Sequence, residues 1–372
     1  MILNKYSVIK TITPMVQSKE INFDGQNIYI GIDVHLKTWN VTIITQSGYK
    51  KKHSQKSSAK ELFEHLKKHY PNGIYQAVYE SGFSGFSTYY ALQEYGINCM
   101  VIHAADVPTT QYENVMKSDP VDSEKLAKAL KASTLKGIYI RRKANLDNRS
   151  VVRIRKTLKR QLGGYKSRVK HLLYNNGVQL PDCFSSSNTH WSKRFMSWLR
   201  EDVVLLSSSR IGLDLLLEQV DLFRKSLLKA NRLLRDLSRS PMYAERYAIL
   251  ISIPGIGVNT AMCLLTEIDD ISRFNNQREF ASYLGLIPTS HSSGEKSCNG
   301  EKTFRGNKKI GPMLVESSWV IIRHDRVMAA AYGGYCKHMK PQEAIIRIAR
   351  KLSSRILNVL KNGKKYEYDR CR

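Results

Sequence analysis

Four carboxylates stand where the folded chain could bring them together. Asp33 ends one predicted buried strand, and Glu80 directly follows another. Asp119 and Asp122 are three residues apart at the start of a predicted helix, so they share a face. In an open α/β sheet, the ends of strands and the starts of helices meet in one crevice. We therefore expect the four acids to lie close together.

Gathered carboxylates repel one another, at a cost of about 4 kcal/mol for two charges about 4 Å apart at an effective dielectric near 20. A divalent cation removes this cost, and oxygen-only ligands suit Mg²⁺ or Mn²⁺. Two such ions about 4 Å apart serve phosphoryl transfer. Taken singly, each acid also fits a turn or cap role, as Asp119 does before Pro120. The set predicts a metal site, with turn and cap roles as the alternative.

The polar stretch near position 293 is a second candidate centre. Ser292 and Ser293 precede Gly294, and such a trio is also typical of a simple turn. A serine hydroxyl can attack a phosphodiester when a neighbouring base or metal activates it. Four nearby side chains could transfer a proton or neutralise a phosphate: His291, Lys296, Arg305 and Lys308.

The elements around the acids alternate as in an α/β domain. Hydrophobic runs predict strands at 29–34, 39–45, 74–79 and 98–102, and helices at 57–70, 86–95 and 119–133. Ser57 or Ser58 would cap the first of these helices. Residues 1–27 are polar and weakly patterned, which predicts a flexible arm.

Long helices are predicted from Val151 onward, at 151–174 and about 211–238. Apolar residues of the second helix follow a heptad spacing, which favours a coiled coil. The seam comprises Leu213, Leu216, Val220, Phe223, Leu227, Ala230, Leu234 and Leu237. An internal helical hairpin and a dimer contact both fit this seam. The last 30-odd residues are basic and predicted to be helical as far as Leu360.

The charge of the chain points to a polyanionic partner. Lys and Arg total 59 against 32 Asp and Glu, so the net charge is 59 − 32 = +27. Nucleic acid is the first candidate and an anionic membrane surface the second. The uncharged run Ala248–Thr266 contains Pro254 and Gly255, which predicts two short helices and not a membrane span. Six scattered cysteines give no zinc motif and suit reduced thiols in a cytoplasm.

Two further features suit nucleic-acid backbones. The helix 151–174 carries eight cations and no acid, which favours phosphate contacts that weaken with salt. The eight are Arg153, Arg155, Lys156, Lys159, Arg160, Lys166, Arg168 and Lys170. The segment Ile253–Gly257 looks like a helix-hairpin-helix turn, in which Gly255 and Gly257 would direct N–H groups at a phosphate. Tight packing of two helices is the alternative role of these glycines.

Three motifs carry a resemblance to a known family. Gly31–His35, Tyr79–Gly82 and Lys117–Asp122 resemble the motifs of the DEDD insertion-sequence transposases, which are also known as bridge-RNA-guided recombinases. The resemblance extends from about Ile28 to about Asp325. It implies a RuvC-like first domain of the RNase H type, with Mg²⁺ bound by Asp33, Glu80, Asp119 and Asp122. The family often has Arg-Asn between the last two acids where this chain has Pro-Val, but those positions are not ligands.

The same resemblance covers the serine stretch. Residues 283–296 are similar to the second catalytic motif of these transposases, in which a serine forms a covalent link to DNA. Ser293, directly before the glycine, is the first candidate and Ser292 the second. Arg305–Asn307 could hold a phosphate at the start of the following helix. The resemblance also implies a guide RNA alongside transposon DNA.

We therefore predict an α/β plus α protein with an RNase H-like (RuvC-like) domain at 28–145 and a coiled-coil helical region at 146–245. A mainly helical, serine-bearing transposase domain would follow at 246–340, and a basic tail at 341–372. The predicted function is a Mg²⁺- or Mn²⁺-dependent transposase and recombinase in a prokaryotic cytoplasm, associated with the nucleoid. Its partners would be transposon-end and target DNA, a guide (bridge) RNA, and further copies of itself in a dimer or tetramer, with no membrane. The alternatives are a metal-only nuclease of the junction-resolvase type and a non-catalytic nucleic-acid-binding protein.

Overall fold

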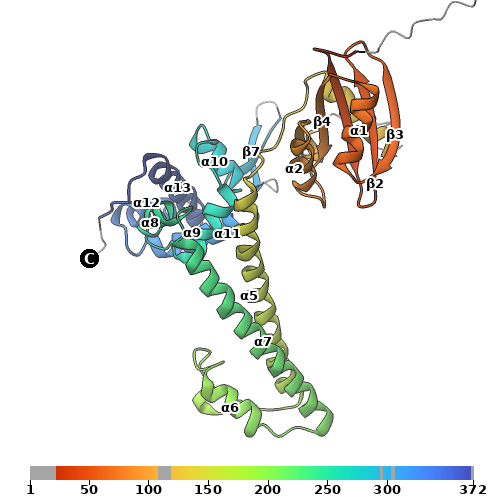
Figure 1. Ribbon diagram of the computed structural model, residues 1–372. Helices are drawn as coiled ribbons and strands as arrows, with labels where there is room; N and C mark the ends of the chain where they lie inside the picture. The colour runs from red at the N-terminus through yellow and green to blue at the C-terminus, as the bar shows by residue number, and fades with distance from the viewer. Residues whose placement is uncertain (1–21, 108–118, 294–295, 303–305, 370–372) are drawn as a thin grey trace, which may run out of the picture. The chain divides into compact units, whose positions relative to one another are not determined.

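The chain forms two compact units that meet in the sequence between Ile140 and Arg141. The computed structural model describes residues 22–107, 119–293, 296–302 and 306–369 (Figure 1). Each unit has a hydrophobic core of its own. The finer division of the second unit at 245 and 340 stays a prediction.

A five-stranded sheet organises the first unit. Its strands are β1 (Asn27–Val34), β2 (Thr38–Thr45), β3 (Lys50–Lys56), β4 (Ile74–Glu80) and β5 (Asn98–Ile102). The spatial order is β3-β2-β1-β4-β5. The first three strands are antiparallel neighbours, whereas β1, β4 and β5 run parallel. This mixed sheet is compatible with the RNase H-like domain that the sequence predicted.

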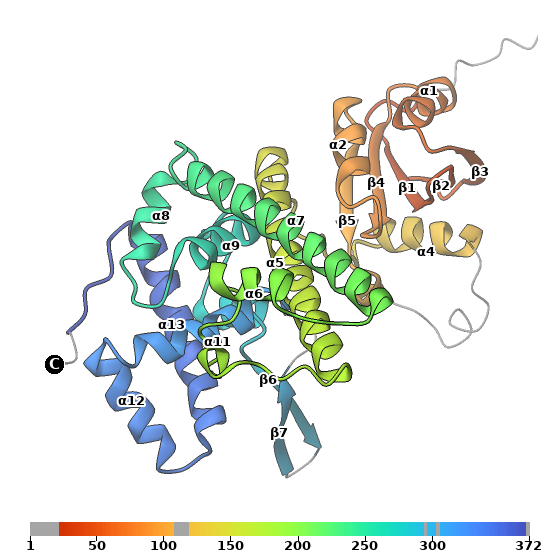
Figure 2. The ribbon, with the colours of Figure 1, turned by 90° about the horizontal axis from the view of Figure 1, so that it is seen from below.

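Helices cover both faces of this sheet. Alternate residues of β1 point to opposite faces, so each face has side chains that a helix can bury. Ile28, Ile30 and Ile32 pack on one face with α1 (Ala59–His69) and α2 (Ser87–Glu94). On the other face, α4 (Asp119–Lys131) packs over β1, β2 and β4 (Figure 2). Ser58 caps α1 by accepting a hydrogen bond from the backbone of Glu61, as predicted.

Two features of the first unit differ from the prediction. Strand β3 was missed, because its sequence KKKHSQK lacks the β-branched and aromatic residues typical of strands. It lies at the edge of the sheet, where lysines commonly discourage pairing with another chain. The predicted arm 1–27 also ends too late, because Phe23 packs against Tyr70 and β1 starts at Asn27. Residues 1–21 of this arm lie outside the described ranges.

The second unit begins with two long helices that pack side by side, α5 (Lys143–Asn175) and α7 (Ser207–Ser238) (Figure 1). Between them the chain forms η2 (Asp182–Phe184) and α6 (Lys193–Glu201). Leu213 and Val220 of the heptad seam are fully buried in one core with Val169 of α5. The seam is thus filled within the chain, as an internal hairpin requires. A coiled coil between copies stays a prediction.

The remaining helices form the largest core of the chain. They are α8 (Ala244–Ile251), α9 (Val258–Ile268), α10 (Gln277–Tyr283), α11 (Ile310–Ile321), α12 (Arg326–Cys336) and α13 (Pro341–Asn362). The helix predicted as far as Leu360 is confirmed by α13, which buries one face, with Ile345, Ile348 and Leu352 in the core. Within the described ranges, no helix is long and apolar enough to cross a membrane.

Candidate active site and nucleic-acid interface

Asp33 and Glu80 lie at the carboxyl ends of two neighbouring parallel strands. Ile32 of β1 is paired with Tyr79 of β4, and each acid is the next residue along its strand. Neighbouring parallel strands are about 4.8 Å apart, so the two acids lie side by side at the carboxyl end of the sheet. The Asp33 side chain is 23% exposed, and its Oδ2 lies 3.1 Å from Nε2 of His35.

Helix α4 runs in the direction opposite to β1. At its end, Nζ of Lys131 donates to the carbonyl of Thr45, 3.2 Å away, and Thr45 is paired with Ile28 at the start of β1. Nearer its beginning, the backbone of Ser123 lies directly on Gly31, where an added Cβ would be 2.0 Å from the Ser123 carbonyl oxygen. The helix therefore begins at the edge of the sheet where β1 ends.

This direction carries the helix acids toward Asp33 and Glu80. Asp119 precedes Ser123 by about 6 Å of helix, and Asp33 lies about 6.6 Å beyond Gly31 along β1. Along the direction of β1, the backbone of Asp119 therefore lies at about the same height as Asp33. The side chain of Asp119 lies outside the described part. Asp122 is half-buried, one turn before Leu126, which packs on β4. Asp122 therefore lies above β4, toward Glu80.

The neighbouring acid Glu124 has a different role. Its carboxylate binds Lys50, Lys52 and Lys128 at 2.6–2.8 Å. Burial alone would raise the pKa of Glu124, but hydrogen bonds from these three lysines outweigh it and lower the pKa to about 2. Glu124 therefore fixes α4 to β3 and stays charged.

The acids offer hard oxygen donors, which fit Mg²⁺ or Mn²⁺. Among the described side chains, which omit Asp119, no three acids, histidines or cysteines lie close enough to hold a metal ion. The metal site therefore stays a prediction that rests on the placement of four backbone positions.

We expect Gly31→Ala to destabilise the first unit by about 3 kcal/mol. The new Cβ would meet two backbone atoms of α4, the Ser123 oxygen at 2.0 Å and the Ala127 nitrogen at 2.5 Å, so the whole helix would have to move. Denaturant unfolding followed by circular dichroism measures the change. Gly164→Ala in α5 is the control, because nothing lies within 4 Å of its Cβ position. Equal stability of the two variants would contradict the proposed contact.

The polar stretch around the two serines forms a β-hairpin. Strand β6 (Pro288–Ser293) pairs with β7 (Lys296–Lys302), and Ser293 stands opposite Lys296. Both candidate serines thus belong to the end of the ladder next to positions 294–295. Their side chains, that of Lys296 and the whole of Arg305 lie outside the described part, whereas Lys308 is exposed.

The two ends of this hairpin are held together at its base. Gly306 lies on Gly285 so closely that a Cβ on Gly306 would be 2.2 Å from the Gly285 Cα. The backbone N–H of Asn307 donates to the Tyr283 carbonyl at 2.7 Å. The position of the hairpin base is therefore set by Tyr283 and Asn307.

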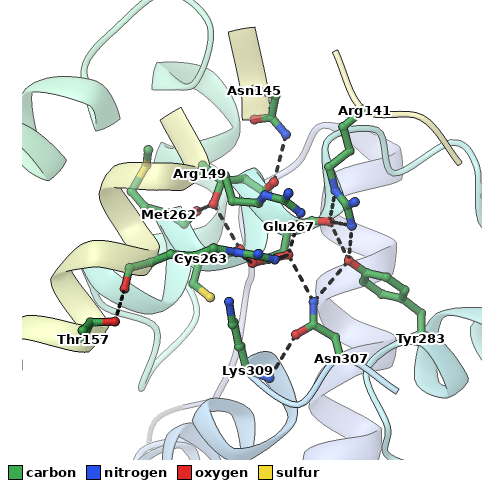
Figure 3. A network of polar contacts seen from close by, with 12 residues as sticks. Arg141, Asn145, Arg149, Thr157, Met262, Cys263, Glu267, Tyr283, Asn307 and Lys309 are labelled. Atoms are coloured by element: carbon green, nitrogen blue, oxygen red, sulfur yellow. Dashed lines mark hydrogen bonds and ion pairs between the residues drawn. The ribbon is translucent and has the colours of Figure 1, made fainter. Parts of the chain in front are cut away.

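A buried carboxylate, Glu267, connects this base to α5 (Figure 3). Its side chain is 1% exposed and accepts hydrogen bonds from Arg153 at 2.9 and 3.1 Å and from Asn307 at 3.4 Å. Arg149 adds an ion pair at 3.5 Å. Burial alone would raise the pKa of Glu267, but Arg153 and Arg149 hold it below its ordinary value. The Tyr283 hydroxyl donates to the Glu267 carbonyl at 2.5 Å.

Sequence reasoning missed this network. Glu267 ends an uncharged helical run, and an acid in such a place is a weak signal of a buried ion pair. Its partners come from three other segments: Arg141, Arg149 and Arg153 from the start of the second unit, Tyr283 from α10, and Asn307 from beyond β7. Only the fold brings these residues together.

The eight cations of α5 divide into two groups. Arg153, Arg155, Lys156 and Lys159 line a cavity beside α9, whereas Arg160 is exposed. Farther along, Lys166 lies over the Trp191 ring, Arg168 over Tyr165, and Nζ of Lys170 is 2.8 Å from His190. The second group already has partners within the chain. In the first group, Arg153 and Arg155 also have partners, Glu267 and Asn231, so the exposed Lys156, Lys159 and Arg160 are better placed to meet a nucleic acid.

The predicted turn between two short helices is present, and its two glycines differ. Gly255 has a φ of +87°, and a Cβ there would lie 2.5 Å from the Ser317 carbonyl oxygen. Gly255 therefore serves close packing on α11. Nothing lies within 4 Å of the Cβ position of Gly257, the residue before α9, so this glycine is the one open to a ligand.

Comparisons with known proteins match the region of the four acids and the region of the two serines. A transposase model of the DEDD type matches residues 30–175, which contain all four acids, and a model described as the transposase IS116/IS110/IS902 family matches residues 247–333, which contain both serines. Two candidate transposases of Sinorhizobium fredii are each 24% identical. One, y4qE, aligns over 65% of this chain and 57% of its own length, and the other, y4rJ, over 82% and 83%.

A third relative is named for its element. The transposase for insertion sequence element IS1533 of Leptospira borgpetersenii is 24% identical over 68% of this chain and 73% of its own length. The chain thus spans little more than half of y4qE and most of the other two relatives. With two models on two separate segments and relatives that name the same activity, this chain belongs to the IS116/IS110/IS902 family of transposases.

Proposed function

We propose that this chain cuts and rejoins DNA strands at the ends of an insertion sequence and at its target. The observation that carries the proposal is the direction of α4, which brings Asp119 and Asp122 to the edge of the sheet that holds Asp33 and Glu80. The DEDD type of transposase implies dependence on a divalent metal in general. We assign Mg²⁺ or Mn²⁺ because all four candidate ligands are carboxylates.

In this proposal Ser293, or Ser292 beside it, is the nucleophile. The serine hydroxyl gives up its proton as its oxygen forms a bond to phosphorus, the bond to the leaving deoxyribose oxygen breaks, and that oxygen takes up a proton in turn. The four carboxylates would hold the cation, and Lys308 would neutralise a phosphate nearby. A bound divalent cation would stabilise the charge that develops on the phosphate and leaving oxygens. Rejoining reverses these bonds, so the serine is released unchanged.

The acids and the serines belong to different compact units, so one catalytic centre need not come from one chain. Strand exchange requires at least two centres, and we propose that the acids of one copy act with the serine of another. Ile211, Leu215 and Leu222 of α7 are 54–61% exposed and supply an apolar surface that a second copy could cover. The guide RNA is proposed from the family resemblance alone.

Trapping of a protein–DNA adduct tests the serine. Full-length protein would be incubated with labelled DNA of the element ends, Mg²⁺ and the RNA transcribed from the element, and the adduct would be mapped to its residue. We expect the double variant Ser292→Ala/Ser293→Ala to lose the adduct and strand cleavage together. Ser297→Ala, on the strand opposite Ser292, is the matched control and should keep both. Cleavage retained in the double variant would instead favour the metal-only nuclease.

A further inference from the structure

A cavity of about 450 Å³ opens in the second unit between α5, the start of α9 and α11. Its cations are Arg153, Arg155, Lys156 and Lys159 of α5, together with Lys309 at the start of α11. Sequence reasoning had passed over Lys309. This side chain lies two residues beyond Asn307, and the Lys309 backbone N–H donates to the Asn307 side chain at 3.0 Å.

The cavity has more positive than negative charge. Its five cations face two carboxylates, Glu267 and Glu316. Glu267 is already paired with Arg153 and with Arg149, and Arg155 donates to the neutral side chain of Asn231 at 2.6 Å. Burial and the nearby Arg153 lower the pKa of Lys309. An anion in the cavity would relieve this crowding of like charges.

The other lining residues limit which kind of anion the cavity could bind. Asn259 and Thr260 belong to the first turn of α9, where backbone N–H groups and the helix dipole favour negative charge. Val152, Met313 and Val320 supply an apolar wall. None of the described lining residues is aromatic, so this cavity offers no ring on which a base could stack. A phosphate with its sugar fits this combination better than a free base.

We propose that this cavity binds a backbone phosphate of DNA, with Lys156 and Lys309 as its principal ligands. The inference rests on the proposed function, because Lys309 joins the cavity to the base of the serine hairpin through Asn307. A phosphate held here would fix a DNA strand relative to that hairpin. The cavity would thus select the backbone and not the base sequence.

Binding in the absence of metal tests this site. Full-length protein in EDTA would be titrated with a fluorescent DNA of the element end, and the affinity measured over a range of salt concentrations. Each lost phosphate contact lowers the slope of log K against log salt by about 1. Because both lysines would bind the same phosphate, we expect Lys156→Ala/Lys309→Ala to lower this slope by about 1 for DNA. Lys351→Ala, an exposed cation of α13, removes one charge away from the cavity and is expected to leave the slope unchanged.

Two outcomes would overturn the site. An unchanged slope in the double variant would show that the cavity holds no DNA phosphate. A loss confined to an RNA of the same sequence would assign the cavity to RNA. Neither metal nor serine chemistry is needed for binding, so the result stays informative if the serine mechanism fails. Thermal unfolding of the variants checks that each is folded.

Discussion

Asp33→Asn is expected to abolish strand cleavage while leaving the fold intact. The amide keeps the shape of the carboxylate but removes one negative charge from the predicted metal site. Divalent cations contribute several kcal/mol to phosphoryl transfer, so we expect the rate to fall by about 10³-fold or more, which corresponds to about 4 kcal/mol. Stability should change little, because the Asp33 side chain is partly exposed and an amide oxygen can still accept a hydrogen bond from His35.

The matched control is Asp24→Asn, the same substitution at an exposed position before β1. Cleavage of labelled element-end DNA would be followed against Mg²⁺ and Mn²⁺ concentration, with metal binding measured separately by calorimetry. EDTA should stop cleavage by the unaltered protein without unfolding it. If Asp33→Asn cleaved as fast as the control, Asp33 would not belong to the catalytic metal site, whereas absence of cleavage by the unaltered protein would favour the non-catalytic alternative.

The strands that hold Asp33 and Glu80 could be predicted because β1 is rich in isoleucine and β4 combines isoleucine, valine and tyrosine, all residues that favour strands. Parallel strands place their carboxyl ends together, so the sequence alone predicted that Asp33 and Glu80 lie at the same end of the sheet. Strand β3 could not be predicted in this way, because its register is set by pairing with β2 and by lysines that bind Glu124. Its local sequence resembles a loop.

In the second unit, local pattern was less informative than tertiary context. Helix α13 was predicted as far as Leu360, but its burial was not. The basic composition suggested an exposed helix, whereas the 3–4 spacing of Ile345, Ile348 and Leu352 places these residues in the core. The serine stretch has the residues of a turn, and only pairing with β7 makes it a strand. The network around Glu267 joins positions more than 100 residues apart, which no local pattern could reveal.

Glu267→Gln is expected to have the largest effect on the stability of the second unit. The carboxylate is almost fully buried, and its loss leaves Arg153 and Arg149 without their shared counter-charge. Removing one partner of a buried ion pair costs about 3–5 kcal/mol. Calorimetry of the full chain should show a melting temperature of the second unit lowered by about 10 °C. Glu316→Gln, which changes an exposed carboxylate of the same cavity, is the control and should change stability by less than about 0.5 kcal/mol.

The pH dependence of this difference separates charge from shape. Because the folded protein holds the pKa of Glu267 below its ordinary value of 4.5, this group stabilises the fold above that pH, and its contribution is lost as the pH falls through the folded-state pKa. The gap between the unaltered protein and Glu267→Gln should therefore be full at neutral pH and narrow in acid. A gap that stays constant from neutral to acidic pH would mean that packing, and not the buried charge, accounts for the loss.

Because Asn307 and Tyr283 bind the same residue at the hairpin base, we also expect slower adduct formation at Ser293 in the folded variant.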